Sequence, residues 1–250
     1  MIFDGHSDIF SDVRYKREAG ETQVLKNHHL DRLRKGGIGG ACFVIWADTY
    51  NGHAPKDEME AIVKGIKGEM AETKEFVLIH NVEELKAAEA AGKFAILLGI
   101  EGLAGIGEDL SKIDELYDLG ARHAMLTWNE ENALATGVTE LGKQAIKKLQ
   151  EKKMILDVSH INEKSFWDVI DLATGPILAS HSNAKALASA ARNLTDDQLR
   201  AIRDTNGLVG LNAFGDFISD NKAEQDVDHL VNHATYIADK IGVEHLGFGF

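Results

Sequence analysis

The sequence predicts an α/β protein of the (β/α)8 TIM-barrel class. Eight short apolar segments recur along the 250 residues, and segments with helical spacing of apolar residues separate them. Most of the short segments are apolar without interruption, as expected for parallel strands that helices cover on both faces. Eight strand–helix repeats without a break in composition are typical of one barrel.

The expected strands and helices follow from these two patterns. The strands are residues 1–4, 40–46, 94–100, 122–127, 154–158, 176–179, 208–212 and 245–250. A short ninth strand, 76–80, is expected outside the main series. The helices are residues 30–35, 57–74, 85–91, 110–119, 139–152, 163–173, 195–204 and 225–241. Residues 81–84 read as a capping box that opens the third of these helices.

No helical segment follows the last expected strand. We therefore expect one domain over residues 1–250 that lacks the last helix of the barrel and is C-terminally incomplete.

Composition excludes several classes of partner. The chain has 27 basic and 40 acidic residues and a net charge of −13, which argues against nucleic acid or an anionic membrane surface. Cys42 is the only cysteine, so no intrachain disulfide can form, and a reducing compartment is expected. No secretion signal opens the sequence and no apolar segment is long enough to span a membrane. We expect a soluble, cytoplasmic protein.

Four of the expected strands end in side chains that bind metals. These side chains are His6, Asp8, Glu101, His160 and His181. The carboxyl ends of barrel strands meet at one face, where such enzymes place their active sites. Five ligands are too many for one tetrahedral zinc and fit two metals that share a carboxylate. A single histidine at a strand end is more often structural. The prediction therefore rests on the presence of metal-binding side chains at the ends of four strands. Asp157 is interpreted as a buried carboxylate that orients His160 rather than as a ligand.

The ligand candidates lie in segments that resemble the metal motifs of the membrane (renal-type) dipeptidase family, peptidase family M19, of the amidohydrolase superfamily. The segments are Asp4-Gly5-His6-Ser7-Asp8, Gly99-Ile100-Glu101-Gly102, Asp157-Val158-Ser159-His160 and Ser180-His181-Ser182-Asn183. Residues 126–129, 191–194 and 242–249 also resemble family segments in order and spacing. The resemblance covers essentially the whole chain.

The resemblance implies a binuclear zinc hydrolase that cleaves dipeptides, including those with a C-terminal D-residue. It implies that His6 and Asp8 bind one zinc ion, that His160 and His181 bind the other, and that Glu101 bridges both as the catalytic carboxylate. The family also suggests a homodimer. A guanidinium suits recognition of a carboxylate, and the resemblance implies this role for Arg192.

The sequence departs from the family pattern at three places. The catalytic aspartate that the family places after strand eight is absent from this chain, which stops at Phe250. Trp128 stands where animal members have a histidine, and Asn129 and Asn132 are the candidates to replace it in substrate binding. Phe214 stands near a position where some relatives have tyrosine, which would change the polarity of the pocket.

Two alternatives remain open at this point. The first is another amidohydrolase, acting on N-acyl amino acids, lactones or phosphotriesters. Most of these enzymes bridge their metals with a carboxylated lysine on strand four. The expected strand four contains no lysine here, so Glu101 as the bridging residue favours a dipeptidase. The second is a catalytically silent protein that keeps its metal for folding or for binding a partner.

His229 and His233 stand four residues apart without a following glutamate, so we interpret them as packing residues.

Overall fold

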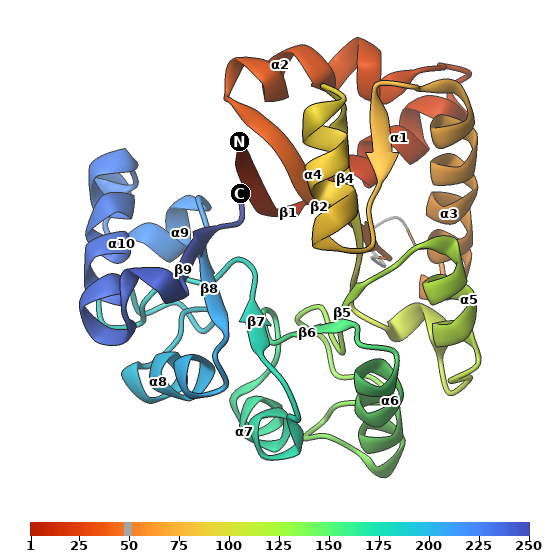
Figure 1. The fold of residues 1–250 in the computed structure, drawn as a ribbon. Coiled ribbons are helices and arrows are strands. Elements are labelled where there is room, and N and C mark those ends of the chain that lie inside the picture. The colour runs from red at the N-terminus through yellow and green to blue at the C-terminus, as the bar shows by residue number, and fades with distance from the viewer. Residues whose placement is uncertain (48–51) are drawn as a thin grey trace. The chain divides into compact units, whose positions relative to one another are not determined.

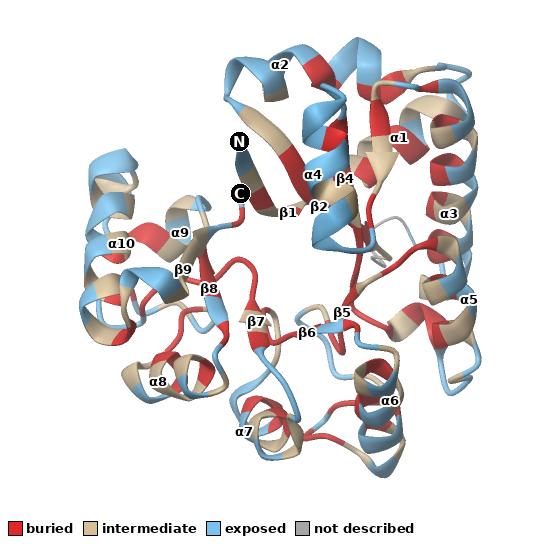
Figure 2. Ribbon diagram, in the orientation of Figure 1, coloured by how far each residue is buried: buried red, intermediate tan, exposed pale blue. Residues whose placement is uncertain are grey.

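The computed structural model describes residues 1–47 and 52–250, in which strands and helices alternate (Figure 1). The chain divides into two compact units, residues 1–124 and residues 125–250. Each unit contains a sheet of parallel strands, and the buried residues concentrate along those strands and on one side of the helices (Figure 2). The predicted α/β class with parallel strands is confirmed. The closed barrel and the single domain stay predictions.

The sheet of the first unit has the strand order β1-β2-β4-β3. Its strands are β1 (Ile2–Ser7), β2 (Ile38–Trp46), β3 (Phe76–Leu78) and β4 (Phe94–Glu101). β2 and β4 are parallel and pair from Gly40 opposite Ala95 to Trp46 opposite Glu101. Both are apolar on both faces, and this matches their nearly complete burial.

Two strands of this sheet differ from the sequence prediction. β3 was expected outside the main series, but it forms the edge of the sheet, where Phe76 lies opposite Phe94. Beyond β3, the same edge of β4 continues in a parallel bridge between Leu98 and Ala121. β1 was expected to end at residue 4, but it reaches Ser7 because Ser7 still pairs with Phe43 of β2.

Helices of the first unit cover its sheet. They are α1 (Ile9–Glu18), α2 (Leu30–Lys35), α3 (Pro55–Glu72), α4 (Val82–Ala90) and α5 (Lys112–Leu119), with a π-turn at Leu25–His29 and a 3-10 turn at Ala104–Ile106. A row of aromatic contacts joins helix to sheet: Phe10 of α1 lies 5.4 Å from Phe43, which stacks at 5.6 Å on Phe94. The predicted capping box of α4 is half formed. Asn81 caps the amide of Glu84, but the Glu84 carboxylate accepts from the His80 amide and the Asn81 side chain instead of from the Asn81 backbone N–H.

The second unit repeats short strands and amphipathic helices. Its sheet has the order β5 (His123–Met125), β6 (Ile155–Asp157), β7 (Ile177–Ala179), β8 (Leu208–Leu211) and β9 (Leu246–Phe248). Its helices are α6 (Glu140–Glu151), α7 (Glu163–Leu172), α8 (Asp196–Asp204), α9 (Gly215–Ile218) and α10 (Val227–Ile241), with 3-10 turns at Lys222–Glu224 and Val243–His245. Polar N-caps start four of these helices: Thr139, Asn162, Thr195 and Asp226 each accept the backbone N–H three residues later. In the described part of the chain, no helix combines the length and apolar character needed to cross a bilayer.

Candidate metal centre

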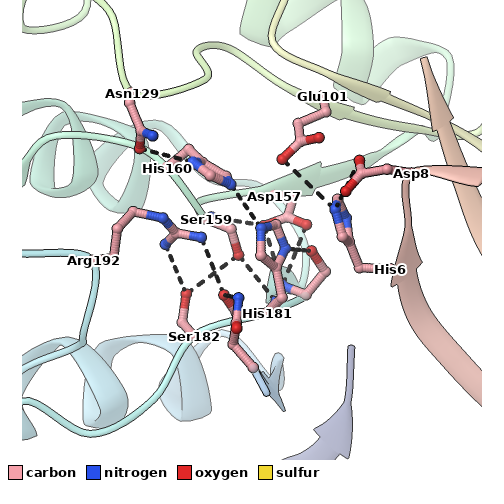
Figure 3. A network of polar contacts seen from close by, with 12 residues as sticks. His6, Asp8, Glu101, Asn129, Asp157, Ser159, His160, His181, Ser182 and Arg192 are labelled. Carbon is pink, nitrogen blue, oxygen red and sulfur yellow. Dashed lines mark hydrogen bonds and ion pairs between the residues drawn. The ribbon is translucent and has the colours of Figure 1, made fainter. Parts of the chain in front are cut away.

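The first unit places a histidine beside a buried glutamate. His6 lies within β1 and Glu101 is the last residue of β4, so both belong to the carboxyl ends of parallel strands. His6 Nε2 lies 3.6 Å from Glu101 Oε1 and 3.6 Å from Asp8 Oδ1 (Figure 3). Both His6 and Glu101 are buried, whereas Asp8 is partly exposed.

The imidazole influences the charge of its carboxylate neighbour. Desolvation by burial alone would raise the pKa of Asp8, but the hydrogen bond and the charge of His6 outweigh it and lower that pKa. Asp8 is therefore ionised at neutral pH. An imidazole nitrogen and two carboxylates form a donor set that suits zinc or another first-row divalent ion.

The second unit brings two further histidines together. His160 and His181 follow the ends of β6 and β7, and their Nε2 atoms lie 2.7 Å apart (Figure 3). His160 Nδ1 lies 2.8 Å from the amide oxygen of Asn129, which can only accept, so Nδ1 carries the proton and Nε2 carries the lone pair. His181 Nδ1 lies 2.8 Å from Ser180 Oγ. At this separation the two Nε2 atoms share a proton, and two imidazoles that follow neighbouring strands are donors of the type that zinc binds.

Asp157 orients the backbone that carries both histidines. Its carboxylate is buried and accepts the N–H of Ser159 at 2.7 Å and the N–H of Ser180 at 3.2 Å. These amides belong to the residues just before His160 and His181. His160 itself has the left-handed value φ = 66°, which is uncommon outside glycine and occurs at functional sites. The position of Asp157 agrees with the orienting role expected from the sequence.

Arg192 lies next to the same backbone. Its guanidinium donates to Ser182 Oγ at 3.3 Å and to the carbonyl of His181 at 3.2 Å (Figure 3). The same group lies 5.6 Å from the ring centroid of Phe217. These contacts hold the cation near His181, and its role in binding the substrate stays a prediction.

The other predicted substrate residues occupy different places. Asn129 contacts His160, as described above. Asn132 donates to the carbonyl of Leu126 at 2.8 Å and accepts the amide of Leu134 at 2.9 Å, so it shapes its own loop. Phe214 is 59% exposed, and its ring lies 4.9 Å from that of Phe217. The ring of Trp128 lies 5.8 Å from the imidazole of His160.

Sequence reasoning missed several buried polar residues around this centre. Ser182 supports Arg192, while Asn183 and His233 connect the following loop to the rest of the second unit. A signal for the first two was present in the sequence, because a run of polar residues follows an apolar strand at 180–183 and is buried. His233 gave no such signal, since one histidine in an amphipathic helix resembles an ordinary packing residue. Among the described residues, the buried candidates for metal ligation are His6, Glu101 and His181.

A sequence model of the membrane dipeptidase family, peptidase family M19, matches residues 1–250. The chain belongs to this family. An M19 dipeptidase of known structure is 25% identical, with a TM-score of 0.87 over 99% of this chain and 84% of that one. A metallopeptidase from Rhodobacter sphaeroides, solved with a phosphinate mimic of the dipeptide L-Ala-D-Ala, gives the same values.

Two curated relatives of this M19 chain are uncharacterised proteins. A protein in the PQQ-III 3′ region of Acinetobacter calcoaceticus is 29% identical over 96% of this chain and 90% of its own length. A protein in the pqqA 5′ region of Klebsiella pneumoniae is 37% identical over 68% of each. Membership in M19 together with the buried His and Glu candidates supports assignment as a metallohydrolase.

Proposed function

We propose that this M19 protein is a binuclear zinc dipeptidase that hydrolyses the peptide bond of dipeptides. His6 and Asp8 would hold one zinc ion, His160 and His181 the other, and Glu101 would bridge the two. The observation that carries this proposal is that His160 and His181 follow neighbouring parallel strands and turn their Nε2 atoms toward each other, in a chain of the M19 family. Donors of this kind suit zinc, which when bound supplies the Lewis acidity that polarises a carbonyl and activates water at neutral pH.

The residues around the ligands prepare them for this task. Asn129 keeps the proton of His160 on Nδ1, which presents the lone pair of Nε2 to the metal. Asp157 holds the backbone before both histidines, so the two rings keep their positions in the absence of metal. This preorganisation lowers the entropy that metal binding must overcome.

Arg192 would bind the free carboxylate of the dipeptide. Its guanidinium is held by Ser182 and by the carbonyl of His181, so substrate binding would not need to order a flexible side chain. A carboxylate fixed there places the scissile bond at a constant distance from His181. The Rhodobacter sphaeroides relative binds a mimic of L-Ala-D-Ala, and we therefore propose dipeptides with a C-terminal D-residue among the substrates. We also propose a homodimer, as the family resemblance suggests.

Hydrolysis of L-Ala-D-Ala and of its C-terminal amide by the zinc-loaded protein tests the proposal. In a form of the protein that carries the catalytic aspartate expected after strand eight, we expect turnover of the dipeptide that a chelator abolishes and zinc restores. Arg192→Met should raise KM for the dipeptide about 10- to 100-fold, the equivalent of one charge-assisted contact, and should change the amide little. Lys185→Met removes an exposed cation from the same loop and serves as the matched control.

Other outcomes would assign a different function. Hydrolysis of N-acyl amino acids or lactones without hydrolysis of dipeptides would indicate another amidohydrolase. Binding of two zinc ions without turnover of any of these compounds would indicate a silent metal-binding protein. Failure to bind zinc would contradict the proposal altogether.

A further inference from the structure

The short helix α9 ends in carbonyl groups that buried side chains satisfy. A helix of this length leaves its last carbonyls without partners inside the helix. Asn183 Nδ2 donates to the carbonyl of Phe217 at 3.1 Å, and Asn193 Nδ2 donates to the same carbonyl at 2.9 Å. His233 Nε2 lies 2.9 Å from the carbonyl of Ile218. Asn183, Asn193 and His233 are all buried, so these contacts are protected from water.

Two of these side chains belong to the segment that carries Arg192, which we call the arginine loop (residues 181–194). The loop is closed by backbone contacts between its two ends. Leu194 N donates to the carbonyl of Asn183, and Lys185 N donates to the carbonyl of Leu194, each at 2.8 Å. A parallel bridge pairs Ala184 with Leu194. The place of Ala184 therefore determines the place of Leu194, two residues after Arg192.

His233 contacts the backbone of Ala184, which is the other partner of this bridge. Its ring belongs to α10 and is completely buried, and its Nδ1 lies 3.0 Å from the N–H of Ala184. Because the backbone N–H can only donate and the Ile218 carbonyl can only accept, the ring must be neutral with its proton on Nε2. Burial lowers the pKa of His233, and this effect outweighs the opposing hydrogen bond to the Ile218 carbonyl. The neutral form that both contacts require is thus the favoured form.

We propose that His233 is a positioning residue for Arg192: acceptance of the Ala184 N–H by His233 Nδ1 fixes the arginine loop and so determines affinity for the substrate carboxylate. The inference rests on the role proposed above for Arg192. A packing residue would act through both hydrogen bonds of its ring alike. Here only the hydrogen bond to Ala184 reaches the backbone contacts that close the arginine loop. The contact with Ile218 serves α9.

Two substitutions separate the two hydrogen bonds. His233→Asn keeps an acceptor near the Nδ1 position and loses the donor to Ile218, whereas His233→Gln keeps a donor near the Nε2 position and loses the acceptor for Ala184. Each leaves one buried backbone group unpaired, so both should lower thermal stability to a similar extent. Thr139→Ala removes the cap of α6 in the same unit, away from the arginine loop, and is a control for destabilisation alone.

The decisive readouts are amide hydrogen exchange and the separation of KM from kcat. In His233→Gln, the amides of Lys185 and Leu194 should exchange at least tenfold faster than in wild type. KM for L-Ala-D-Ala should rise about tenfold with kcat nearly unchanged. In His233→Asn and Thr139→Ala, both quantities should stay within about threefold of wild type.

Equal behaviour of the two His233 variants would overturn the proposal. If wild type hydrolyses no dipeptide, the proposed function fails, but the exchange measurement still decides whether His233 holds the arginine loop. If His233→Gln does not fold, hydrogen exchange of the wild-type protein tests the proposal. An Ala184 amide that is bonded to His233 should exchange as slowly as the amide of Val209 in β8. Rapid exchange at Ala184 in wild type would contradict the inference.

Discussion

Asp157 shows how one buried carboxylate can position two metal-binding side chains. It accepts backbone N–H groups from β6 and from the end of β7, and these immediately precede His160 and His181. A buried carboxylate without hydrogen-bond donors would destabilise the protein. The two backbone N–H groups therefore stabilise the Asp157 carboxylate, and the same hydrogen bonds order the backbone before the two histidines.

Asp157→Asn should weaken zinc binding. The amide keeps the shape of the side chain but loses the charge and directs N–H groups toward a backbone N–H. We expect metal affinity to fall about 10- to 100-fold, as for other residues that orient ligands, and stability to fall by about 1–3 kcal/mol. Competition with a chromogenic chelator measures the affinity. Asp168→Asn is the matched control, since the Asp168 carboxylate on α7 also accepts a backbone N–H, that of Val138. Equal loss of zinc in both variants would contradict the assignment.

The lowered pKa of His233 predicts a dependence of stability on pH. The unfolded protein takes up a proton near the ordinary value of 6.5, whereas the folded protein does so only at a lower pH. The contribution to stability is therefore complete above pH 6.5 and is lost as the pH falls toward the lowered pKa. Between these values, the free energy of unfolding of wild type should fall more steeply than that of His233→Asn, by at most about 1.4 kcal/mol per pH unit.

Urea unfolding at pH values from 7.5 to 5 measures this difference. His229 on the same helix contributes in the opposite direction, because its hydrogen bond to Asp226 raises its pKa. That contribution is the same in both proteins and cancels in the comparison. Identical pH slopes for wild type and His233→Asn would show that His233 is not held neutral.

The identities of the candidate ligands could be predicted from sequence, but their supporting contacts could not. His6 and His181 each stand at the end of an apolar segment, and strand geometry brings such residues to the carboxyl edge of their own sheet. The contact of His233 with Ala184 joins residues 49 positions apart and depends on how α10 packs. Asn129 illustrates the same limit, since it contacts the ring of His160, 31 residues away.

The elements of the second unit owe their boundaries to local signals. α8 begins at a complete capping box, in which Thr195 accepts the amide of Gln198 and the Gln198 side chain accepts the amide of Thr195. Its buried face includes Leu199 and Ile202. The cap directly follows the arginine loop, so the end of that loop and the start of α8 are fixed together.

Thr195→Ala should destabilise the protein by about 1 kcal/mol through loss of the α8 cap. Thr195→Ser keeps the hydroxyl acceptor and should recover most of this loss. The midpoint of urea unfolding, compared at constant slope, measures both effects. A loss of equal size in both variants would indicate that the methyl group of Thr195, and not its hydroxyl, stabilises the helix.

Elements with strong local patterns were predicted well, and elements set by distant pairing were not. The N-caps Thr139 and Thr195 and the apolar spacing behind them indicated α6 and α8 within about a residue. α1 was not predicted, because a short run of apolar residues beside charged ones in Ile9–Glu18 gives a weak helical pattern. β3 was expected outside the main series of strands, and only its pairing with β4 reveals its place at the edge of the sheet.

At the scale of the whole molecule, a bound metal should link function to stability. Ligands that bind the native state alone raise the free energy of unfolding by about 2.7 kcal/mol at one hundred times the dissociation constant. We expect a chelator to lower the unfolding temperature and added zinc to raise it with concentration, as differential scanning calorimetry would measure. His181→Ala should abolish this dependence, whereas His245→Ala, whose ring contacts the Gly207 carbonyl, should keep it. A dependence retained in His181→Ala would contradict the ligand assignment.

The separation of the paired ligands along the chain also bears on the order in which the protein folds. His160 and His181 are 21 residues apart, with β6, α7 and β7 arranged locally around them. His6 and Glu101 are joined only after β2, α3 and α4 have been placed between them. Closing the longer segment costs roughly 1 kcal/mol more chain entropy than closing the shorter one. The pair of His160 and His181 is therefore the one that a refolding chain can assemble first.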